Sequence, residues 1–533
     1  MADELVALLM TEGPCLSGEL ADKLCDALGI SPAAARKKIE RRSDDVRALE
    51  LPFPRKAKFL YLRKQYSTPL FWKRLATALA ESNGAYARAI RALNARDGVI
   101  QRANFAAAAA SSNGTRQISA EDVIQRLVSA TLLQELDVPG LGPCVGFRRG
   151  DAYIDERIPA IRARLIAEEV LLQSVQEWGA KLGLGSFHSF MLRTNVPGLA
   201  PTVSNFEWDL TAPSFLGPLA TWADASKPKP GFFAVDVLLK EEVSADDIQP
   251  FVYKCTALRQ LRGVGRCLQF FVAHRYSREA LSIIRQNGIV AATPESLFGT
   301  DVARALAELT GTLKQAATQS VDPEKFATLF EKLGKSQGAV GTLRGALFEY
   351  LVADVIRHTV AGVDITMNKI YRWNGKDVAE VDVRAVVKDR EIRFIECKGL
   401  LPGRQLSEKD VDDWLVRRIP AVRKQTLENP EWKNIPLKFE MWLTGELSPE
   451  SKARVEAAKA EVNPERYTID VHLASDIEKM VEPLPALRKV VTQHFLRHPL
   501  AAQDDVINPL SKRRINQVEA KFAHLAQPAE DES

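Results

Sequence analysis

The chain has 533 residues, of which 46% are hydrophobic and 26% charged, and its formal net charge is +4. This composition is that of a globular protein and excludes a collagen, a coiled coil or general disorder, and the length predicts about three to five domains. Because 72 basic residues nearly balance 68 acidic ones, the whole-chain charge does not indicate any class of partner.

Cysteine usage and the N-terminus bear on the compartment. The six cysteines are scattered without a Cys-x-x-Cys pair, which argues against a disulfide scaffold or a zinc finger and fits a reducing cytosol. The chain begins Met1-Ala2-Asp3-Glu4, with acid where a secretory signal needs base. No run of about 18 apolar residues could span a bilayer. We therefore expect a cytoplasmic protein with no membrane partner.

Residues 1–66 predict three helices followed by two strands. Apolar residues recur at helical spacing in 4–10 and 17–28, and Gly29 ends the second of these helices. Ser31 and Pro32 then form the N-cap and first residue of a third helix. Strand-like segments at 46–51 and 57–62 follow. This order resembles a winged helix-turn-helix domain, which implies that the third helix lies in or near the major groove of duplex DNA.

The third helix and the segment after it are strongly basic. Between Arg36 and Arg74 there are thirteen Lys or Arg residues against four acids, which is the electrostatic footprint of phosphate binding. Winged helices also serve as protein–protein modules, so DNA binding is inferred here from charge. The candidate nucleic-acid-binding residues are Arg36, Lys37, Lys38, Arg41, Arg42, Arg55, Lys56 and Lys58.

Residues 67–200 are predicted to be mainly helical. One long amphipathic helix runs from Ile158 to Leu182, and Ser119 and Asp122 have the spacing of a capping box at the start of another. A second winged-helix unit at 67–155 is an alternative. We find no catalytic constellation in this region.

Residues 201–300 alternate strands and helices, which predicts a parallel sheet with helical crossovers. The segment resembles an Mrr-like restriction-endonuclease domain. Where that family has an acid-x-lysine triplet, however, this chain reads Asp236-Val237-Leu238. Asp209 could stand for the upstream acid, and Lys240 could replace the lysine only if it reached back. We interpret 201–300 as a degenerate nuclease fold with a structural or DNA-docking role, followed by a helical connector at 301–340.

The chemistry is expected in residues 341–480. A helix at 346–358 carries Glu349, a strand at 381–387 carries Asp382, and the return strand from residue 391 ends in Glu396-Cys397-Lys398. This set resembles the active site of the PD-(D/E)XK (restriction-endonuclease-like) nuclease superfamily. Apolar neighbours make the return strand resemble a central one, where Glu396 and Lys398 are unexpected as surface charges.

The geometry depends on the turn between the two strands. Side chains alternate along a strand, so Glu396 and Lys398 share one face. A two-residue loop would pair Asp382 with Cys397, on the other face, whereas a three-residue loop or a bulge would pair Asp382 with Glu396. If the two acids act together, the turn should be of the second kind.

Two converging carboxylates stay charged when a cation lies between them, and hard oxygen ligands favour Mg²⁺, with Mn²⁺ as a substitute. Lys398 could orient or help deprotonate the attacking water and offset the charge of the phosphorane. Glu349 could complete the metal shell directly or through water. The resemblance implies that the backbone carbonyl of Cys397 is a further ligand and that the products carry 5′-phosphates.

The segments after the active-site strands fit the same fold. Residues 407–428 are predicted as a helix kinked at Pro420, and strands at 439–443 and 467–471 flank a helix at 448–460. The family often places a basic residue or Gln from the first helix near the scissile phosphate, which implies Arg418 and Gln425. Residues 481–533 are predicted as a helical tail with a frayed polar end.

The sequence thus predicts a multidomain α/β plus α protein with an N-terminal winged helix, a helical middle and two restriction-endonuclease-like domains. We expect a Mg²⁺-dependent DNA nuclease, an endonuclease in preference to an exonuclease, acting in prokaryotic restriction, phage defence or repair. A non-catalytic DNA-binding or assembly protein and an RNA nuclease are the alternatives. Double-strand cleavage would call for a homodimer, and a partner protein or activating signal remains open.

Overall fold

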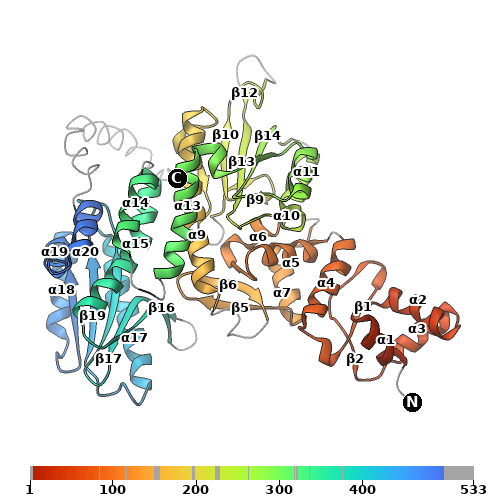
Figure 1. The fold of residues 1–533 in the computed structure, drawn as a ribbon, viewed down its shortest axis with the longest axis horizontal. Coiled ribbons are helices and arrows are strands. Elements are labelled where there is room, and N and C mark those ends of the chain that lie inside the picture. Colours follow the sequence, from red (N-terminus) through yellow and green to blue (C-terminus); the bar gives the residue numbers. More distant parts are fainter. Residues whose placement is uncertain are drawn as a thin grey trace, which may run out of the picture. The chain divides into compact units, whose positions relative to one another are not determined.

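The chain divides into two compact units, Met1–Lys314 and Gln315–Ser533, which are described separately. The structure is a computed structural model, and it describes residues 4–496 except 83, 115–116, 149–155, 195–198, 223–227, 262, 317–318, 320–321, 335–336 and 374–376. Each unit mixes helices with small sheets, so the protein is a mixed α/β multidomain chain (Figure 1). No helix in the described ranges is both long and apolar enough to cross a bilayer.

The first unit begins with three helices, α1 (Glu4–Glu12), α2 (Ser17–Leu28) and α3 (Pro32–Glu40). They pack on a three-stranded antiparallel sheet of order β1-β3-β2, formed by β1 (Cys15–Leu16), β2 (Val46–Ala48) and β3 (Phe59–Leu62). Ser31 caps α3 by accepting a hydrogen bond from the backbone N–H of Ala34, and Pro32 is its first residue, as the sequence predicts. The three helices and two strands predicted for 1–66 are therefore confirmed in their order, whereas β1, between α1 and α2, was not predicted.

Residues 67–200 are mainly helical, as predicted, but they also contain a small sheet, which the alternative of a second winged-helix unit at 67–155 allowed for. The helices α4 (Pro69–Ser82), α5 (Ala85–Ala95), α6 (Phe105–Ala108) and α7 (Ala120–Ser129) are joined by a sheet of order β4-β6-β5. Its strands are β4 (Val99–Gln101), β5 (Leu133–Val138) and β6 (Gly142–Phe147). Strands β5 and β6 form an antiparallel hairpin that the sequence pattern does not indicate. Polar residues interrupt the apolar residues of β5, and the turn depends on the positive φ of Gly140 and Gly142.

The long helix α9 (Ile158–Lys181) matches its prediction and packs near the larger sheet of the first unit. That five-stranded sheet has the order β15-β14-β13-β10-β7. It begins at β7 (Met191–Leu192), before the predicted boundary at 200, and continues with β10 (Leu210–Ser214), β13 (Gly231–Leu238), β14 (Cys267–Ala273) and β15 (Val290–Ala292). Strands β7, β10 and β13 pair antiparallel, and β13, β14 and β15 pair parallel.

Two crossover helices and several short elements complete this unit. The crossovers are α10 (Ala245–Gln260) and α11 (Arg278–Gln286), and α10 buries Ile248, Phe251 and Cys255 against the sheet. The short pairs are β8 (Thr202–Val203) with β9 (Phe206–Glu207) and β11 (Thr221–Trp222) with β12 (Pro228–Lys229). The helices α12 (Pro294–Phe298) and α13 (Thr300–Ala316) follow.

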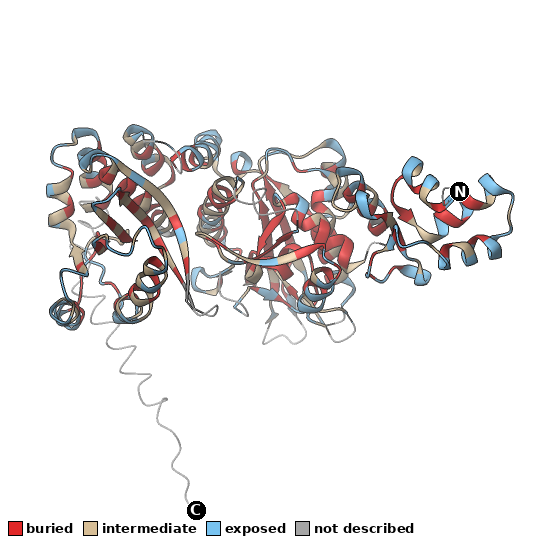
Figure 2. Cartoon of the chain, turned by 90° about the horizontal axis from the view of Figure 1, so that it is seen from below, coloured by how far each residue is buried: buried red, intermediate tan, exposed pale blue. Residues whose placement is uncertain are grey.

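The second unit repeats the strand order of that sheet. The helices α14 (Pro323–Leu333) and α15 (Gln337–Thr359) lead into β16 (Val363–Trp373), β17 (Asp377–Val387) and β18 (Glu391–Lys398), which pair antiparallel. Strands β19 (Leu437–Leu443) and β20 (Tyr467–His472) then add in parallel to give the order β16-β17-β18-β19-β20. Figure 2 shows buried residues gathered along the sheets and on the helix faces that cover them.

The helix predicted at 407–428 is present without a break and has three segments that differ in hydrogen-bonding type. The first is α16 (Glu408–Asp412), the second a π-helical turn η5 (Asp413–Arg418), and the third α17 (Ile419–Glu428), which has Pro420 in its first turn. Proline has no N–H to donate, so the π-helical turn stands where a regular helix would be interrupted. The unit ends with α18 (Pro449–Glu461), α19 (Ala474–Met480), α20 (Pro485–Val490) and the π-helical η6 (Val491–Leu496), and the remaining predicted tail lies outside the described residues.

Candidate active site

The hairpin between β17 and β18 has the register that brings the two strand acids together. Val387 pairs with Glu391, so the loop contains three residues, and the ladder continues to Val383 opposite Ile395. One step further along the same register places Asp382 across from Glu396. The choice that the sequence left open is therefore settled in favour of the three-residue loop, with Asp389 at a φ of 57°.

Asp382 lies where this ladder ends, and its carboxylate accepts a hydrogen bond from the backbone of the neighbouring strand. Its Oδ2 accepts a hydrogen bond of 2.7 Å from the backbone N–H of Cys397, the residue between Glu396 and Lys398. Burial raises the pKa of Asp382 well above its ordinary value, and the charges of Glu396 and Glu349 raise it further. Asp382 is thus within electrostatic reach of both Glu396 on the neighbouring strand and Glu349 on α15.

Glu396 is 4% exposed and holds two cations. Its Oε1 lies 2.8 Å from the Nζ of Lys398 and 2.7 Å from a guanidinium nitrogen of Arg418. Burial lowers the pKa of Lys398, but Glu396 and Asp382 outweigh it and the net pKa is raised. Lys398 is therefore an ammonium at neutral pH, so it is suited to orienting groups and offsetting negative charge rather than to accepting a proton.

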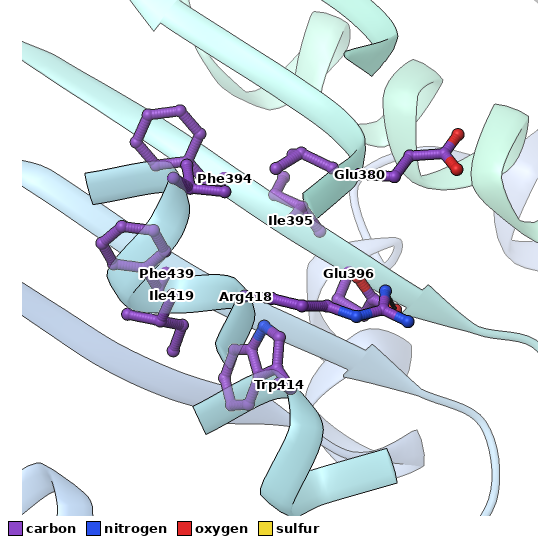
Figure 3. A pocket seen from close by; sticks show the side chains of 10 residues that line it. Glu380, Phe394, Ile395, Glu396, Trp414, Arg418, Ile419 and Phe439 are labelled. Atoms are coloured by element: carbon purple, nitrogen blue, oxygen red, sulfur yellow. Dashed lines mark hydrogen bonds and ion pairs between the residues drawn. The ribbon is translucent and has the colours of Figure 1, made fainter. Parts of the chain in front are cut away.

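Arg418 is fixed from its other side by the turn that carries it. Its Nε donates to Asp413 at 2.8 Å within the π-helical turn η5. Figure 3 shows its guanidinium beside Glu396, with Trp414 below it. The void lined by these side chains has a volume of about 10 Å³, which is room for about one water molecule and not for a nucleotide. Gln425 lies two helical turns further along α17 and is half-buried.

One residue near this site was not predicted from the sequence. Asn368 on β16 falls between the pairs Met367–Val383 and Lys369–Val381, and so lies across from Asp382 where the β16–β17 ladder is interrupted. It is 6% exposed, has a φ of 54°, and its side-chain oxygen has no hydrogen-bond partner. The sequence offered only one weak signal for Asn368, its residue type. Asparagine is depleted in strands and enriched at positive φ, so it can mark a break in a ladder.

Gly399 permits the close approach of the helix that carries Glu349. A Cβ at this position would lie 2.6 Å from the carbonyl oxygen of Arg344 and 2.8 Å from the Cβ of Phe348, both on α15. Any larger residue would push the end of β18 away from α15. The glycine that ends the predicted strand is thus required by tertiary packing.

The carboxylates of Asp382 and Glu396 are oxygen ligands of the type that Mg²⁺ or Mn²⁺ binds, although the protein offers few of them. No three His, Cys, Asp or Glu side chains among the described residues come together as a metal-binding group. Magnesium, however, keeps several waters and is commonly held by one or two carboxylates together with substrate phosphates. The pair Asp382 and Glu396, with an unpartnered amide oxygen at Asn368 nearby, fits that description.

The basic residues predicted to contact nucleic acid lie on the first unit. Lys37 and Lys38 on α3 and Arg41 directly after it line a surface hollow of about 460 Å³, and Lys38 is paired with Glu4. Arg36 is exposed and Arg42 half-buried. Arg55 and Lys56 occupy left-handed backbone positions between β2 and β3, and these residues and Lys58 are exposed. These side chains thus belong to one small domain and, with few exceptions, face solvent.

No family model matches this chain, and no curated protein matches it either. The assignment of its function therefore depends on the residues themselves.

Proposed function

We propose that this chain is a metal-dependent nuclease of the PD-(D/E)XK kind that hydrolyses phosphodiesters of DNA, with Mg²⁺ as cofactor and Mn²⁺ as a substitute. The observation that carries the proposal is the pairing of Asp382 with Glu396 at the end of the β17–β18 ladder, beside the ammonium of Lys398. Glu396 adds to the burial that raises the pKa of Asp382, and two buried acids side by side are costly to keep charged unless a cation joins them.

Each residue has a distinct part in this proposal. Asp382 and Glu396 would hold the metal, with Glu349 and the backbone carbonyl of Cys397 completing its shell directly or through water. When bound, the metal would polarise the phosphodiester and lower the pKa of a water molecule. Lys398 would orient that water and balance the charge that develops on the phosphoryl oxygens.

Arg418 is assigned to the scissile phosphate. Its guanidinium is held by Asp413 and Glu396 beside the site, and it would pair with a phosphate oxygen of the substrate. Gln425 lies on the same helix two turns away and would serve the adjoining phosphate or nucleotide. Both assignments agree with what the resemblance implies for the helix after the Glu-x-Lys strand.

The N-terminal part supports a DNA substrate. The order of α1, β1, α2, α3, β2 and β3, with basic residues exposed along α3 and beyond, supports the proposal of a winged helix that binds duplex DNA. The sheet β15-β14-β13-β10-β7 would be a degenerate Mrr-like copy of the nuclease fold. A role in restriction, phage defence or repair in a prokaryotic cytoplasm follows from this combination by analogy alone.

A second candidate function is a non-catalytic DNA-binding protein that uses both sheets as scaffold. The observation in its favour is that Glu396 already has two cationic partners, Lys398 and Arg418, so its charge is balanced without a metal. In that case Lys398 would contribute to stability only. Activity measurements on matched variants separate the two functions.

The test compares cleavage of plasmid, linear duplex, single-stranded DNA and RNA with Mg²⁺, Mn²⁺ or EDTA. The variants are Lys398→Ala and Asp382→Ala, and Lys388→Ala in the turn of the same hairpin is the control, since Lys388 is exposed. We expect metal-dependent cutting that is lost in the first two and kept in the control. Folded wild-type protein that binds duplex but cuts nothing would favour the scaffold, and cutting by both active-site variants would refute this site.

A further inference from the structure

The first unit contains a second pair of acids with the same backbone geometry. The ladder between β10 and β13 pairs Leu210 with Val235, so one step further Asp209 lies across from Asp236. Asp209 Oδ2 accepts a hydrogen bond of 2.8 Å from the backbone N–H of Val237, just as Asp382 Oδ2 accepts one of 2.7 Å from Cys397. In addition, Asp236 Oδ1 accepts a hydrogen bond of 3.1 Å from the backbone N–H of Asp209.

The position corresponding to Lys398 is Leu238, so the strand itself supplies no cation. The charge comes instead from the next helix, α10. Lys254 is completely buried, and its Nζ lies 2.5 Å from Asp236 Oδ2. The same ammonium donates to the backbone carbonyls of Glu207 at 2.8 Å and Ala107 at 3.2 Å. Lys240 does not take this place, because its ammonium pairs with Asp247.

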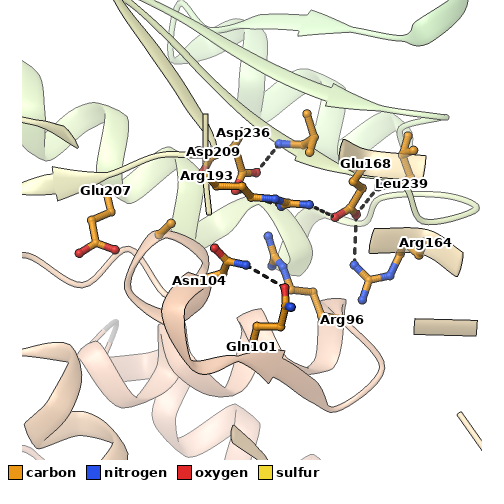
Figure 4. Close-up of polar contacts among 12 residues, drawn as sticks. Arg96, Gln101, Asn104, Arg164, Glu168, Arg193, Glu207, Asp209, Asp236 and Leu239 are labelled. Atoms are coloured by element: carbon orange, nitrogen blue, oxygen red, sulfur yellow. Dashed lines mark hydrogen bonds and ion pairs between the residues drawn. The ribbon is translucent and has the colours of Figure 1, made fainter. Parts of the chain in front are cut away.

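Arginines balance the remaining acids of this cluster (Figure 4). Arg193 lies 3.1 Å from Asp209 and 2.8 Å from Glu168 of α9. Glu168 also accepts from Arg164 at 3.1 Å and from the backbone N–H of Leu239 at 3.0 Å. Asp209, Asp236 and Glu168 are therefore all paired within the protein. Glu168 lies on the helix that precedes the sheet, as Glu349 does in the second unit.

We propose that the Asp209–Asp236 pair is a cation site that the ammonium of Lys254 fills permanently, in place of a divalent metal ion. An ammonium is a compact charge with three donors, and here all three have acceptors. It therefore meets the two requirements of a buried cation, an opposite charge and full hydrogen bonding. A divalent ion could enter only by expelling Lys254 into apolar surroundings that include the ring of Trp208, 4.2 Å from the Nζ.

The lysine also explains what this site does. Its hydrogen bond to Ala107 connects α10 to α6, and its hydrogen bond to Glu207 connects α10 to strand β9. The acid pair and Lys254 thus connect α6, β9, α10 and β13 within the first unit. The inference goes beyond the nuclease proposal, since it concerns different residues and holds whether or not the second unit cuts DNA.

The first test is Mn²⁺ binding measured by calorimetry on full-length chains that all carry Asp382→Ala, which removes the Asp382–Glu396 site. We expect no binding that depends on Asp236 while Lys254 is present. Adding Lys254→Ala should create one Mn²⁺ site, and adding Asp236→Asn should abolish it. Binding that requires Asp236 in the presence of Lys254 would overturn the proposal, and so would a failure of Lys254→Ala to create a site in folded protein.

A second measurement covers the case in which Lys254→Ala does not fold. Lys254→Met keeps most of the aliphatic part of the side chain but leaves Asp236 without its cation. The urea concentration at the midpoint of unfolding of the first unit should therefore fall. Adding Asp236→Asn removes the uncompensated charge and should restore most of the loss. If the double variant is as unstable as the sum of the single ones, Lys254 serves packing alone and the proposal is wrong. Hydrogen exchange of β13 peptides assigns the transition to this unit.

Discussion

Replacing Glu168 by Gln tests the charge network of the first unit most directly. Glu168 is 1% exposed and bound to Arg164, Arg193 and the backbone N–H of Leu239. Burial alone would raise its pKa, but Arg164 and Arg193 outweigh burial and lower the pKa from 4.5 to about 2. Since one unit of pKa is worth about 1.4 kcal/mol, the ionised form contributes about 3 kcal/mol to the free energy of unfolding.

The pH dependence follows from the sign of this shift. A depressed carboxylate pKa stabilises the fold fully above the unfolded pKa of 4.5, and this stabilisation is lost as the pH falls toward about 2. Glu168→Gln should therefore cost about 3 kcal/mol at pH 7 but only about 1.5 kcal/mol at pH 3. Asp236, whose pKa is raised to about 6 chiefly by burial, titrates in both the wild type and Glu168→Gln. Its contribution therefore largely cancels in the difference between their free energies of unfolding.

The assay is urea unfolding at the two pH values, followed by hydrogen exchange of peptides from β13 so that the result belongs to the first unit. The control is Glu169→Gln, the same change at the exposed neighbouring position, which should cost less than about 0.5 kcal/mol. An equal loss for Glu168→Gln at pH 7 and pH 3 would refute the reasoning, because the effect would then come from packing and not from charge.

Four further predictions concern DNA binding and the candidate active site. Gly399→Ala should lower the stability of the second unit by about 1–3 kcal/mol in urea unfolding and reduce cleavage, because its Cβ would meet α15, whereas Gly345→Ala in α15 meets nothing within 4 Å and should be neutral or stabilising. Arg418→Met should lower the rate of cleavage at least about tenfold, as loss of a donor to a developing negative charge does, whereas Arg417→Met, which loses a contact to Asp413 but none to Glu396, should change the rate little in the same assay. The affinity for Mn²⁺, measured by calorimetry, should rise about tenfold per pH unit below the raised pKa of Asp382, since the metal must displace a proton, and Asp382→Asn should flatten this dependence. Each of Lys37→Ala and Arg41→Ala should reduce the slope of log affinity for duplex DNA against log salt concentration by about 0.9, whereas Lys181→Ala, at an exposed position on α9, should not.

The two sheets show how an acid pair can be balanced by different means. In the second unit the cation on the strand is Lys398, and in the first it is Lys254 on the following helix. The strand lysine is partly exposed, with 25% of its side chain accessible, whereas Lys254 has none. A partly accessible ammonium can move aside for a metal or a phosphate, and a fully buried one with three hydrogen bonds cannot do so without disturbing the fold.

Much of the local structure was predictable from short-range signals. The caps at Ser31 and Ser119 each begin the helix that was expected there, since a serine hydroxyl accepts a hydrogen bond from a backbone N–H three residues on. The strand at 391–398, whose charged residues alternate in part with Ile392, Phe394 and Cys397, was equally clear. The residues of the candidate site, Asp382, Glu396, Lys398 and Glu349, could be chosen because their types and their order in the elements are local facts.

What only the tertiary structure decided were contacts between residues distant in sequence. Lys254 meets Ala107 across 147 positions and Asp236 across 18, and no periodicity relates them. The three-residue turn at 388–390 was one of two open choices until the register was known, and the hairpin of β5 and β6 was hidden because its alternation of polar and apolar residues is weak. Local sequence specifies caps, periodicity and turn residues, whereas the partner of a buried charge depends on how whole elements pack, which the sequence determines only through the complete fold.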